Sequence, residues 1–224
     1  CHWRHFARVG MRPLIALSNA TRRAVRGVLL DIDDTLTTDG WLTAEAFAAL
    51  AELRTAGKLV VPVTGRPAGW CDHMARMWPV DAIVGENGAF YFRYDHDSRR
   101  MTRRYQVDGD AIAANRAKFQ AIGEKIVAAV PGAAIAADQA YRETDLAIDF
   151  CEDVRPLERN AIDQIVRLMI DAGMTVKVSS IHVNGWFGAY DKLKMIRQFF
   201  DEVFHVNLDQ EKKRFVFVGD SPNN

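Results

Sequence analysis

Hydrophobic positions in the first half of the chain alternate between short continuous runs and longer stretches with helical spacing. The apolar run at 25–30 predicts a buried strand that ends at the first acidic residue of the chain. Similar runs at 59–63 and 82–84 predict two more strands, with Pro62 as an unusual member of the first of them. Strands that alternate with helices in this way predict a parallel βαβαβ unit with right-handed crossovers.

Two helices are expected between these strands. Thr43 is a suitable N-cap for the first, whose apolar positions Phe47, Leu50 and Leu53 recur at helical spacing before Gly57 ends it. Pro67 is suited to the first turn of the second helix. The apolar positions of this second helix are expected at Trp70, Met74 and Met77.

The pattern changes after residue 88, because strands now follow one another and alternate in polarity. The expected elements are a hairpin of 89–94 with 99–106, a helix at 111–130, strands at 133–137, 146–150 and 174–178, and a helix from Pro156 to Gly173. Two helices with several alternating strands predict a small α+β layer. The parallel pattern then resumes with a helix after Asp191 and a strand at 214–218.

The predicted fold class is therefore α/β, a Rossmann-like parallel-sheet core that carries an inserted α+β cap domain. We expect a basic N-terminal arm at 1–24, a core made of 25–99 and 187–224, and the cap at 100–186. The arm contains no acidic residue. Met11 is a plausible natural start, and the basic stretch is interpreted as a solvated arm rather than a transit peptide.

Composition narrows the possible partners. The 29 Lys and Arg residues equal the 29 Asp and Glu residues, so global charge gives no reason to expect nucleic acid or an anionic membrane as a partner. No apolar run has the length of a membrane span. The distant cysteines Cys1, Cys71 and Cys151 fit neither a disulfide framework nor a zinc site. We expect a cytoplasmic protein, as a monomer or homodimer.

Candidate chemistry begins with Asp31 and Asp33, two carboxylates that follow the first buried strand. A cation between them would relieve their mutual repulsion. An accidental acidic turn is the alternative interpretation. A calcium loop of the EF-hand type is excluded, because such a loop needs glycine at its sixth position and Leu36 occupies it.

Three further segments fall at strand ends or helix starts, the edge of a parallel sheet where ligands bind. Thr64, Gly65 and Arg66 follow the second strand, where a hydroxyl and backbone N–H groups can hold a phosphate or simply cap the helix. Lys192 begins the helix after the cap, a position where a lysine is more often solvent-exposed. Asp220 follows the last strand and is suited to a hard cation such as Mg²⁺.

In this order the four segments resemble the motifs of the haloacid dehalogenase superfamily. These motifs are an Asp-x-Asp-x-Thr sequence, a Thr or Ser after the second strand, a Lys, and a Gly-Asp sequence, and the match spans about residues 25–224. The position of the insertion, together with 85–89, is similar to the branch with an α/β cap that contains sucrose-phosphate and mannosylphosphoglycerate phosphatases.

The resemblance implies a mechanism. Asp31 attacks phosphorus and forms an aspartyl-phosphate, and Asp33 protonates the leaving alcohol and then deprotonates the hydrolytic water. Thr64 hydrogen-bonds a phosphoryl oxygen, and Lys192 offsets charge on the phosphate and on Asp31. The resemblance further implies that Mg²⁺ is bound by the carboxylates of Asp31 and Asp220 and by the main-chain carbonyl of Asp33.

The remaining residues of the predicted site are less specific. Gly65 and Arg66 are candidate phosphate ligands, with Arg66 equally suited to a structural ion pair, and Asn223 is a candidate to orient phosphate or Lys192. Asn224 stands where the family commonly has aspartate, so we expect weaker metal binding. The resemblance also implies further core elements after this residue.

The cap is expected to select the substrate. Polar candidates near its strand ends are Arg142, Glu143, Ser180, His182 and Asn184. His182 is either a ligand or a structural histidine, and Trp186 is expected to be hinge packing. The predicted substrate is a small phosphorylated metabolite, such as a sugar phosphate or a related polyol or acid phosphate, a preference that rests on the family resemblance.

Two other functions stay open. A phosphomutase or phosphotransferase would pass the aspartyl-phosphate of Asp31 to an acceptor other than water. A non-catalytic sensor of phosphorylated metabolites would explain the neutral side chain of Asn224 as decay of the metal site. The presence of Asp31, Asp33, Thr64, Lys192 and Asp220 argues against the sensor.

Overall fold

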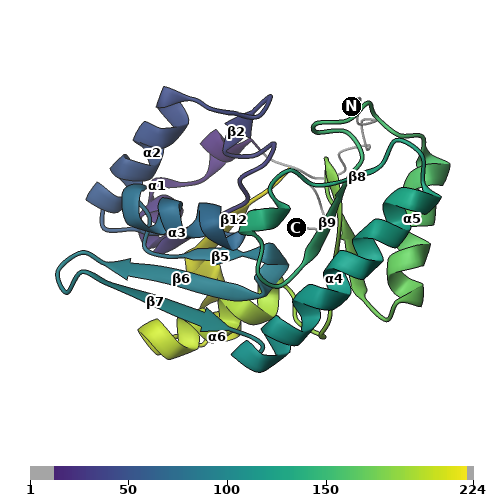
Figure 1. Ribbon diagram of the computed structural model, residues 1–224. Coiled ribbons are helices and arrows are strands. Elements are labelled where there is room, and N and C mark those ends of the chain that lie inside the picture. Colours follow the sequence, from purple (N-terminus) through teal and green to yellow (C-terminus); the bar gives the residue numbers. More distant parts are fainter. Residues whose placement is uncertain (1–12, 221–224) are drawn as a thin grey trace.

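A computed structural model describes residues 13–220 and shows a mixed α/β protein with a parallel core sheet and a second, antiparallel sheet (Figure 1). This confirms the predicted fold class. The core sheet has the order β12-β1-β4, formed by Phe215–Val218, Gly27–Leu30 and Leu59–Pro62. All its strands are parallel, with Leu29 beside both Phe217 and Val61.

The core sheet continues through a single parallel bridge between Val63 and Val84. Val84 belongs to β5 (Ile83–Gly85), which pairs antiparallel with β6 (Phe90–Asp95), and β6 pairs with β7 (Arg100–Tyr105). The predicted hairpin is therefore present, and it extends the core. The predicted cap boundary at residue 100 falls inside this pairing, so the pairing favours a boundary after Tyr105, although the division into domains remains a prediction.

Helices cover both faces of the core sheet. Leu30, Val60 and Ile83 pack against α2 (Ala44–Thr55) and α3 (Ala68–Met77). Their sequence neighbours Leu29, Val61 and Val84 pack on the other face, against α6 (Lys192–Phe204). Because successive side chains of a strand point to opposite faces, the continuous apolar runs of these strands are what two covered faces require.

Local signals set most helix ends. The side chain of Thr43 accepts a hydrogen bond from Ala46 N, and Asp191 caps α6 in the same way through Lys194 N. Gly57 has a φ of +71°, as expected for a residue that ends a helix. The predicted apolar face of α3 was partly wrong, because Trp70 is 43% and Met77 69% exposed.

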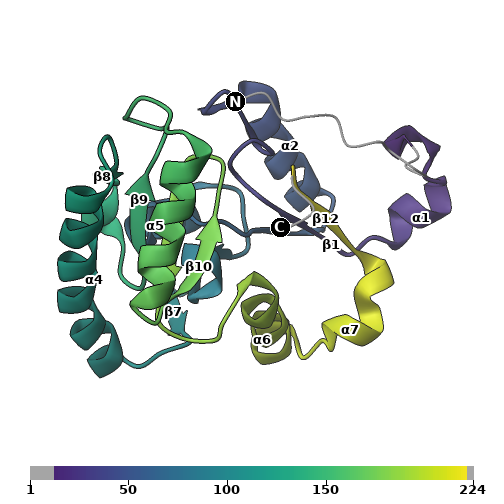
Figure 2. The ribbon, with the colours of Figure 1, turned by 90° about the vertical axis from the view of Figure 1, so that its right-hand side faces the viewer.

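The cap consists of an antiparallel sheet covered by two helices. The order of the sheet is β10-β11-β9-β8, formed by Thr175–Val178, His182–Trp186, Leu146–Asp149 and Ala134–Ile135. Helices α4 (Gly109–Ala129) and α5 (Arg159–Asp171) pack their apolar sides on it (Figure 2). The prediction that Pro156 opens α5 was wrong, since Glu158 is the N-cap.

The central strand β11 was not predicted, because Asn184 and Gly185 interrupt its pattern. Gly185 is needed for packing: a Cβ there would lie 2.8 Å from the sulfur of Met169, a residue of α5. The small elements that complete the described chain are η1 (Leu14–Ala16), α1 (Asn19–Ala24), β2 (Thr37–Thr38), β3 (Trp41–Leu42), η2 (Glu86–Gly88), η3 (Gln139–Tyr141), α7 (Leu208–Glu211) and η4 (Lys212–Arg214). Within residues 13–220, none of the helices combines the length and apolar character that crossing a bilayer requires.

Candidate active site

Asp31 and Asp220 leave neighbouring strands at the same edge of the core sheet. Leu30 and Val218 are register partners at the ends of β1 and β12, and Asp31 N donates to Val218 O over 2.9 Å. The carbonyl of Ile32 then accepts from three following N–H groups, which bends the chain immediately after the strand. The predicted convergence of acidic side chains at this edge thus follows from strand register and one tight turn.

Lys192 brings a positive charge to Asp31. Its Nζ lies 2.8 Å from Asp31 Oδ1, and both side chains are nearly buried, 12% and 10% exposed. The start of α6 packs directly on Gly88, because a Cβ on Gly88 would lie 2.2 Å from Asp191 O and 2.5 Å from Lys192 N. The glycine therefore helps to set the position of Lys192. Burial raises the pKa of Asp31, Lys192 opposes that rise, and the charges of Asp33 and Asp220 add to it. A cation near these carboxylates would remove the repulsion.

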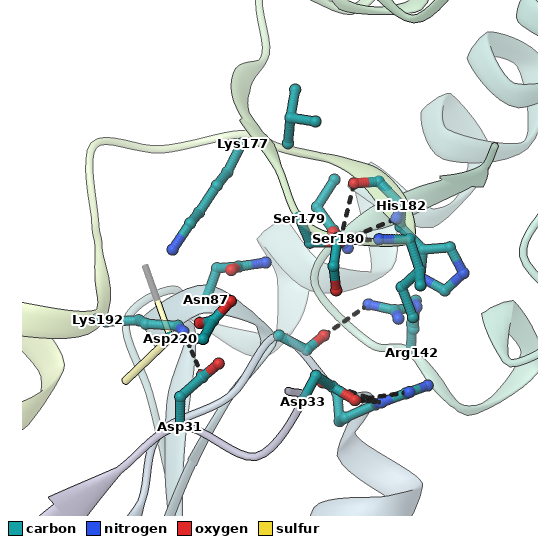
Figure 3. A pocket seen from close by; sticks show the side chains of 15 residues that line it. Asp31, Asp33, Asn87, Arg142, Lys177, Ser179, Ser180, His182, Lys192 and Asp220 are labelled. Atoms are coloured by element: carbon teal, nitrogen blue, oxygen red, sulfur yellow. Dashed lines mark hydrogen bonds and ion pairs between the residues drawn. The ribbon is translucent and has the colours of Figure 1, made fainter. Parts of the chain in front are cut away.

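These residues border a cavity of ≈ 100 Å³ between the core and the cap (Figure 3). Its lining combines core and cap side chains: Asp31, Asp33, Gly65, Arg66, Asn87, Arg142, Lys177, Val178, Ser179, Ser180, Ile181, His182, Asn184, Lys192 and Asp220. Most of the site residues predicted from sequence are therefore brought together. The cavity is small and most of its lining residues are polar or charged, which suits a small charged ligand.

Asp33 is held by Arg66. Both nitrogens Nε and Nη2 of Arg66 contact Asp33 Oδ1, at 2.9 and 2.7 Å, and Nε also contacts Oδ2 at 3.2 Å. The third nitrogen, Nη1, lies 3.1 Å from Glu152 of the cap. The structure thus shows Arg66 as an ion-pair partner, one of the two roles expected for it.

Thr64 is fully buried and does not border the cavity. Its hydroxyl accepts a hydrogen bond from Arg66 N over 3.0 Å, and its carbonyl accepts from Asn87 N. Thr64 therefore shapes the turn between β4 and α3, and its predicted contact with a phosphoryl oxygen stays a prediction. Gly65 does border the cavity, and its carbonyl accepts from Arg142 Nη1 over 3.0 Å.

The predicted cap residues fall into two groups. Arg142, Ser180, His182 and Asn184 border the cavity, whereas Glu143 does not and instead accepts from Tyr105 Oη over 2.7 Å. Arg142 is 4% exposed and forms one ion pair with Asp138 and another with Asp145. Asn184 donates to the same Asp145. Trp186 is 3% exposed and stacks on Tyr190, which agrees with the expected packing role.

His182 borders the cavity and lies beside Glu152. Its Nε2 is 2.9 Å from Glu152 Oε2, close enough for an ion pair, although the N–H does not point well enough for a hydrogen bond. His182 and Arg66 together lower the pKa of Glu152 to about 2, so this carboxylate is ionised at neutral pH. Of the two roles expected for His182, the structure shows the pairing with Glu152.

Sequence reasoning missed Lys177 as a residue of the site. It extends from β10 toward Lys192 in the cavity (Figure 3). Burial lowers its pKa to about 8, and the charge of Lys192 contributes to the same effect. Its only sequence signal was a polar residue between Val176 and Val178 in a predicted strand.

Asn87 and Glu86 belong to the segment that resembled the phosphatase branch, and they have different surroundings. Asn87 borders the cavity, and its buried Nδ2 has no hydrogen-bond partner among residues 13–220. Such a donor is suited to an oxygen of a bound ligand. Glu86 is fully buried instead, and it accepts from Ala68 N of the core and from the cap residues Glu143 and Thr144. Burial, followed by the charge of Asp145, raises the pKa of Glu86 to about 7.

The donor set at the sheet edge fits Mg²⁺. Asp31 and Asp220 supply carboxylate oxygens at one edge, and Mg²⁺ in proteins commonly takes one or two carboxylates and keeps several waters. Within residues 13–220 there is no group of three or more His, Cys, Asp or Glu side chains that could form a complete metal cage. Asn223 and Asn224, the remaining predicted participants, lie outside the described residues.

Comparisons with known proteins bear on the family and the fold. The sequence model of the haloacid dehalogenase-like hydrolase family matches residues 28–129, just under half of the chain, a segment that includes Asp31, Asp33 and Thr64. A search of curated protein sequences gave no significant match. The matched segment agrees with the predicted resemblance to this family and with the predicted hydrolase class.

Several solved structures share the fold. A protein of Thermoplasma acidophilum has a TM-score of 0.63 and 13% identity over 86% of this chain and 76% of its own. A trehalose-6-phosphate phosphatase related protein has a TM-score of 0.55 and 15% identity, covering 78% of this chain and 73% of its own. The IMP-nucleotidase of Plasmodium falciparum has a TM-score of 0.55 and 11% identity, and the match covers 87% of this chain but 54% of the nucleotidase.

Proposed function

We propose that this chain, a haloacid dehalogenase-like hydrolase, is a Mg²⁺-dependent phosphatase that hydrolyses phosphate monoesters through an aspartyl-phosphate on Asp31. The observation that carries the proposal is the position of Asp31, which lies nearly buried at the sheet edge, 2.8 Å from Lys192, in a cavity of ≈ 100 Å³. A carboxylate with one adjacent ammonium group and one neighbouring acid is suited to attack phosphorus.

Each residue of the cavity has a distinct task in this mechanism. Asp31 attacks the phosphorus, and Lys192 offsets the charge shared by Asp31 and the phosphoryl oxygens. Asp33 protonates the leaving oxygen and later takes a proton from the attacking water. The buried Nδ2 of Asn87 supplies a hydrogen-bond donor to the phosphoryl group. Asp31, Asp220 and the Asp33 carbonyl would hold Mg²⁺, which would supply charge neutralisation and in-line orientation of the phosphoryl group.

The proposed substrate is a small phosphorylated metabolite, namely a sugar phosphate or a related polyol or acid phosphate. The cavity volume supports a small molecule, and the cap side chains Lys177, Arg142, His182 and Asn184 support a polar one. Two of the similar structures are named for phosphate esters of small metabolites, trehalose 6-phosphate and IMP. The expected cytoplasmic location and the monomer or homodimer belong to the same proposal.

The test is phosphate release from a panel of phosphorylated sugars, polyols, acids and nucleotides, with and without Mg²⁺. The decisive variant is Asp31→Asn, and Asp34→Asn is its control because Asp34 lies three residues away, is exposed and has a φ of 57° that asparagine tolerates. We expect Asp31→Asn to lose activity by at least about 10³-fold, as for removal of a covalent nucleophile, and Asp34→Asn to keep it. Normal turnover by Asp31→Asn would refute the nucleophile assignment.

The same assay separates the alternatives. If phosphate appears on an added acceptor alcohol rather than in water, the chain is a phosphotransferase or phosphomutase. If substrates bind saturably in the presence of Mg²⁺ and no phosphate is released or transferred, it is a sensor.

A further inference from the structure

A continuous row of ion pairs joins the cap to the core through Arg66. On the core side its Nε and Nη2 contact the carboxylate of Asp33 at 2.9 and 2.7 Å. On the cap side its Nη1 contacts Glu152 Oε1 at 3.1 Å. The Arg66 side chain is only 11% exposed, whereas the side chains of Asp33 and Glu152 are 27% and 30% exposed. The guanidinium is therefore nearly buried between two partly exposed carboxylates. The sequence motifs did not link Asp33 or Arg66 to any residue of the cap.

The loop that carries Glu152 is rigidly built. Asp149, at the end of β9 and 1% exposed, accepts hydrogen bonds from the backbone N–H groups of Cys151, Glu152 and Asp153, at 2.7 to 2.8 Å. The other oxygen of Glu152 lies 2.9 Å from His182 Nε2 on β11. Glu152 is therefore fixed by its own backbone and by the neighbouring strand.

The Arg66 side chain has no spare freedom in this arrangement. Each guanidinium nitrogen contacts a carboxylate. In addition, Arg66 Cζ lies over the ring of Trp70, 4.7 Å from the ring centroid. The planar fork of an arginine transmits such fixed geometry better than a lysine can. Because Arg66 is occupied on both sides, it is better suited to hold Asp33 than to bind a substrate phosphate.

We infer that Glu152 is a positioning residue of the cap, which holds Arg66 and thereby places the Asp33 carboxyl group for proton transfer to the leaving oxygen. The acid is then in its working position only when the cap covers the core, so cap closure and protonation of the leaving group are coupled. This inference rests on the proposed phosphatase function. It assigns to a cap residue a role in the chemical step rather than in substrate binding.

A leaving-group comparison distinguishes positioning from a merely structural role. An alkyl phosphate such as glycerol phosphate has a poor leaving group, whose oxygen must be protonated by a general acid. The p-nitrophenolate released from p-nitrophenyl phosphate is a stable anion, so this ester depends less on the general acid. The value of kcat/KM reports the steps up to the transfer to Asp31, and so isolates this event from the later hydrolysis. The full chain is assayed with Mg²⁺ on both esters.

The variant is Glu152→Gln, which keeps the shape and removes the charge. Asp153→Asn is the matched control, because Asp153 is the next residue of the same loop and is exposed. For Glu152→Gln we expect kcat/KM to fall about 10-fold on the alkyl ester and less than about 2-fold on p-nitrophenyl phosphate, since general acids contribute about 10²–10⁴-fold in full. Asp153→Asn is expected to match the wild type on both.

Arg66→Lys provides a second variant, because it keeps the charge and removes the fork. The same selective loss on the alkyl ester is expected, with thermal unfolding used to confirm that each variant folds. Equal losses on both esters, or no loss on either, would overturn the inference while leaving the phosphatase proposal intact. Absence of phosphate release by the wild-type chain from every ester would overturn both.

Discussion

The two sides of the cavity are constructed differently. On the core side, Asp31, Asp220 and Lys192 are placed by backbone structure, since two of them follow neighbouring parallel strands and the third begins a helix. On the cap side, the side chains are placed by one another, through the pairs of Arg142 with Asp138 and Asp145 and of Arg66 with Glu152.

This difference indicates a division of labour. Groups held by the backbone keep one geometry whatever the cap does, which suits the nucleophile and its counter-charge. Groups held by ion pairs across two layers depend on how those layers dock. We therefore expect changes on the core side to reduce the chemical step, and changes on the cap side to affect substrate binding, proton transfer or docking.

The two lysines of the cavity give the strongest contrast. We expect Lys192→Met to lower kcat by about 10²–10³-fold, the usual effect of removing one group that stabilises developing charge. Lys177→Met, the matched change from the cap, is expected to raise KM about 10-fold with a smaller effect on kcat, because its ammonium group lies in the same cavity on a cap strand. Steady-state kinetics on one substrate measures both, and a larger loss of kcat in Lys177→Met would refute the division.

Two glycines test whether backbone fit places Lys192. Gly88→Ala puts a Cβ 2.2 Å from Asp191 O at a φ of +99°, so the start of α6 must shift. We expect kcat to fall up to about 10²-fold, the cost of a displacement of roughly 1 Å at a catalytic group. Gly57→Ala is the control, since its φ is also positive, at +71°, with nothing within 4 Å of the new Cβ.

The control variant should lose about 1 kcal/mol of stability through backbone strain and keep its activity. Similar kinetic losses in the two variants would show that strain, rather than contact with α6, lowers activity. Urea unfolding and steady-state kinetics on the same preparations separate these outcomes.

Glu86 tests the docking of the two layers. Glu86→Ala leaves three backbone N–H groups without their acceptor, the buried ones of Ala68 and Thr144 and the half-buried one of Glu143. We expect the free energy of unfolding to fall by about 2–3 kcal/mol, because each unsatisfied buried donor carries a penalty of about 1–3 kcal/mol and local relaxation recovers part of the sum. Glu45→Ala, an exposed position in the first turn of α2, should change it by less than about 0.5 kcal/mol.

The same residue predicts a pH dependence of stability. Since burial raises the pKa of Glu86 from 4.5 to about 7, the native state binds a proton that the unfolded state has lost between these pH values. The stability that this group contributes is present below pH 4.5 and is lost as the pH rises toward 7, by about 1–3 kcal/mol. Glu86→Gln does not titrate, so the stability of the wild type relative to this variant should fall over that window. A constant difference would contradict the raised pKa.

The positions of the core-side residues at the sheet edge were predictable from the sequence, for a physical reason. Asp31, Lys192 and Asp220 lie next to element boundaries, and the ends of parallel strands must meet at one edge. Helix starts at Thr43 and Asp191 were predictable because a single side chain makes each cap. These features depend on a few neighbouring residues, and a sequence displays them directly.

The cap side was not predictable in the same way. Lys177 borders the cavity because β10 pairs with β11. The strand β11 was not predicted, since Asn184 and Gly185 interrupt its hydrophobic pattern. Glu152 and Arg66 are 86 positions apart and meet only when the two layers dock. Such contacts depend on the arrangement of whole layers, which local pattern and cap residues do not determine.

In the proposed mechanism Asp31 itself carries the phosphoryl group during turnover. The most direct measurement is acid quenching of the enzyme during turnover with Mg²⁺ and a substrate from the panel, followed by peptide mass mapping. We expect one added phosphoryl group on the peptide that contains Asp31, absent without substrate and absent in Asp31→Asn. Turnover of the wild type with phosphate on another residue, or Asp31→Asn still phosphorylated on this peptide, would contradict it.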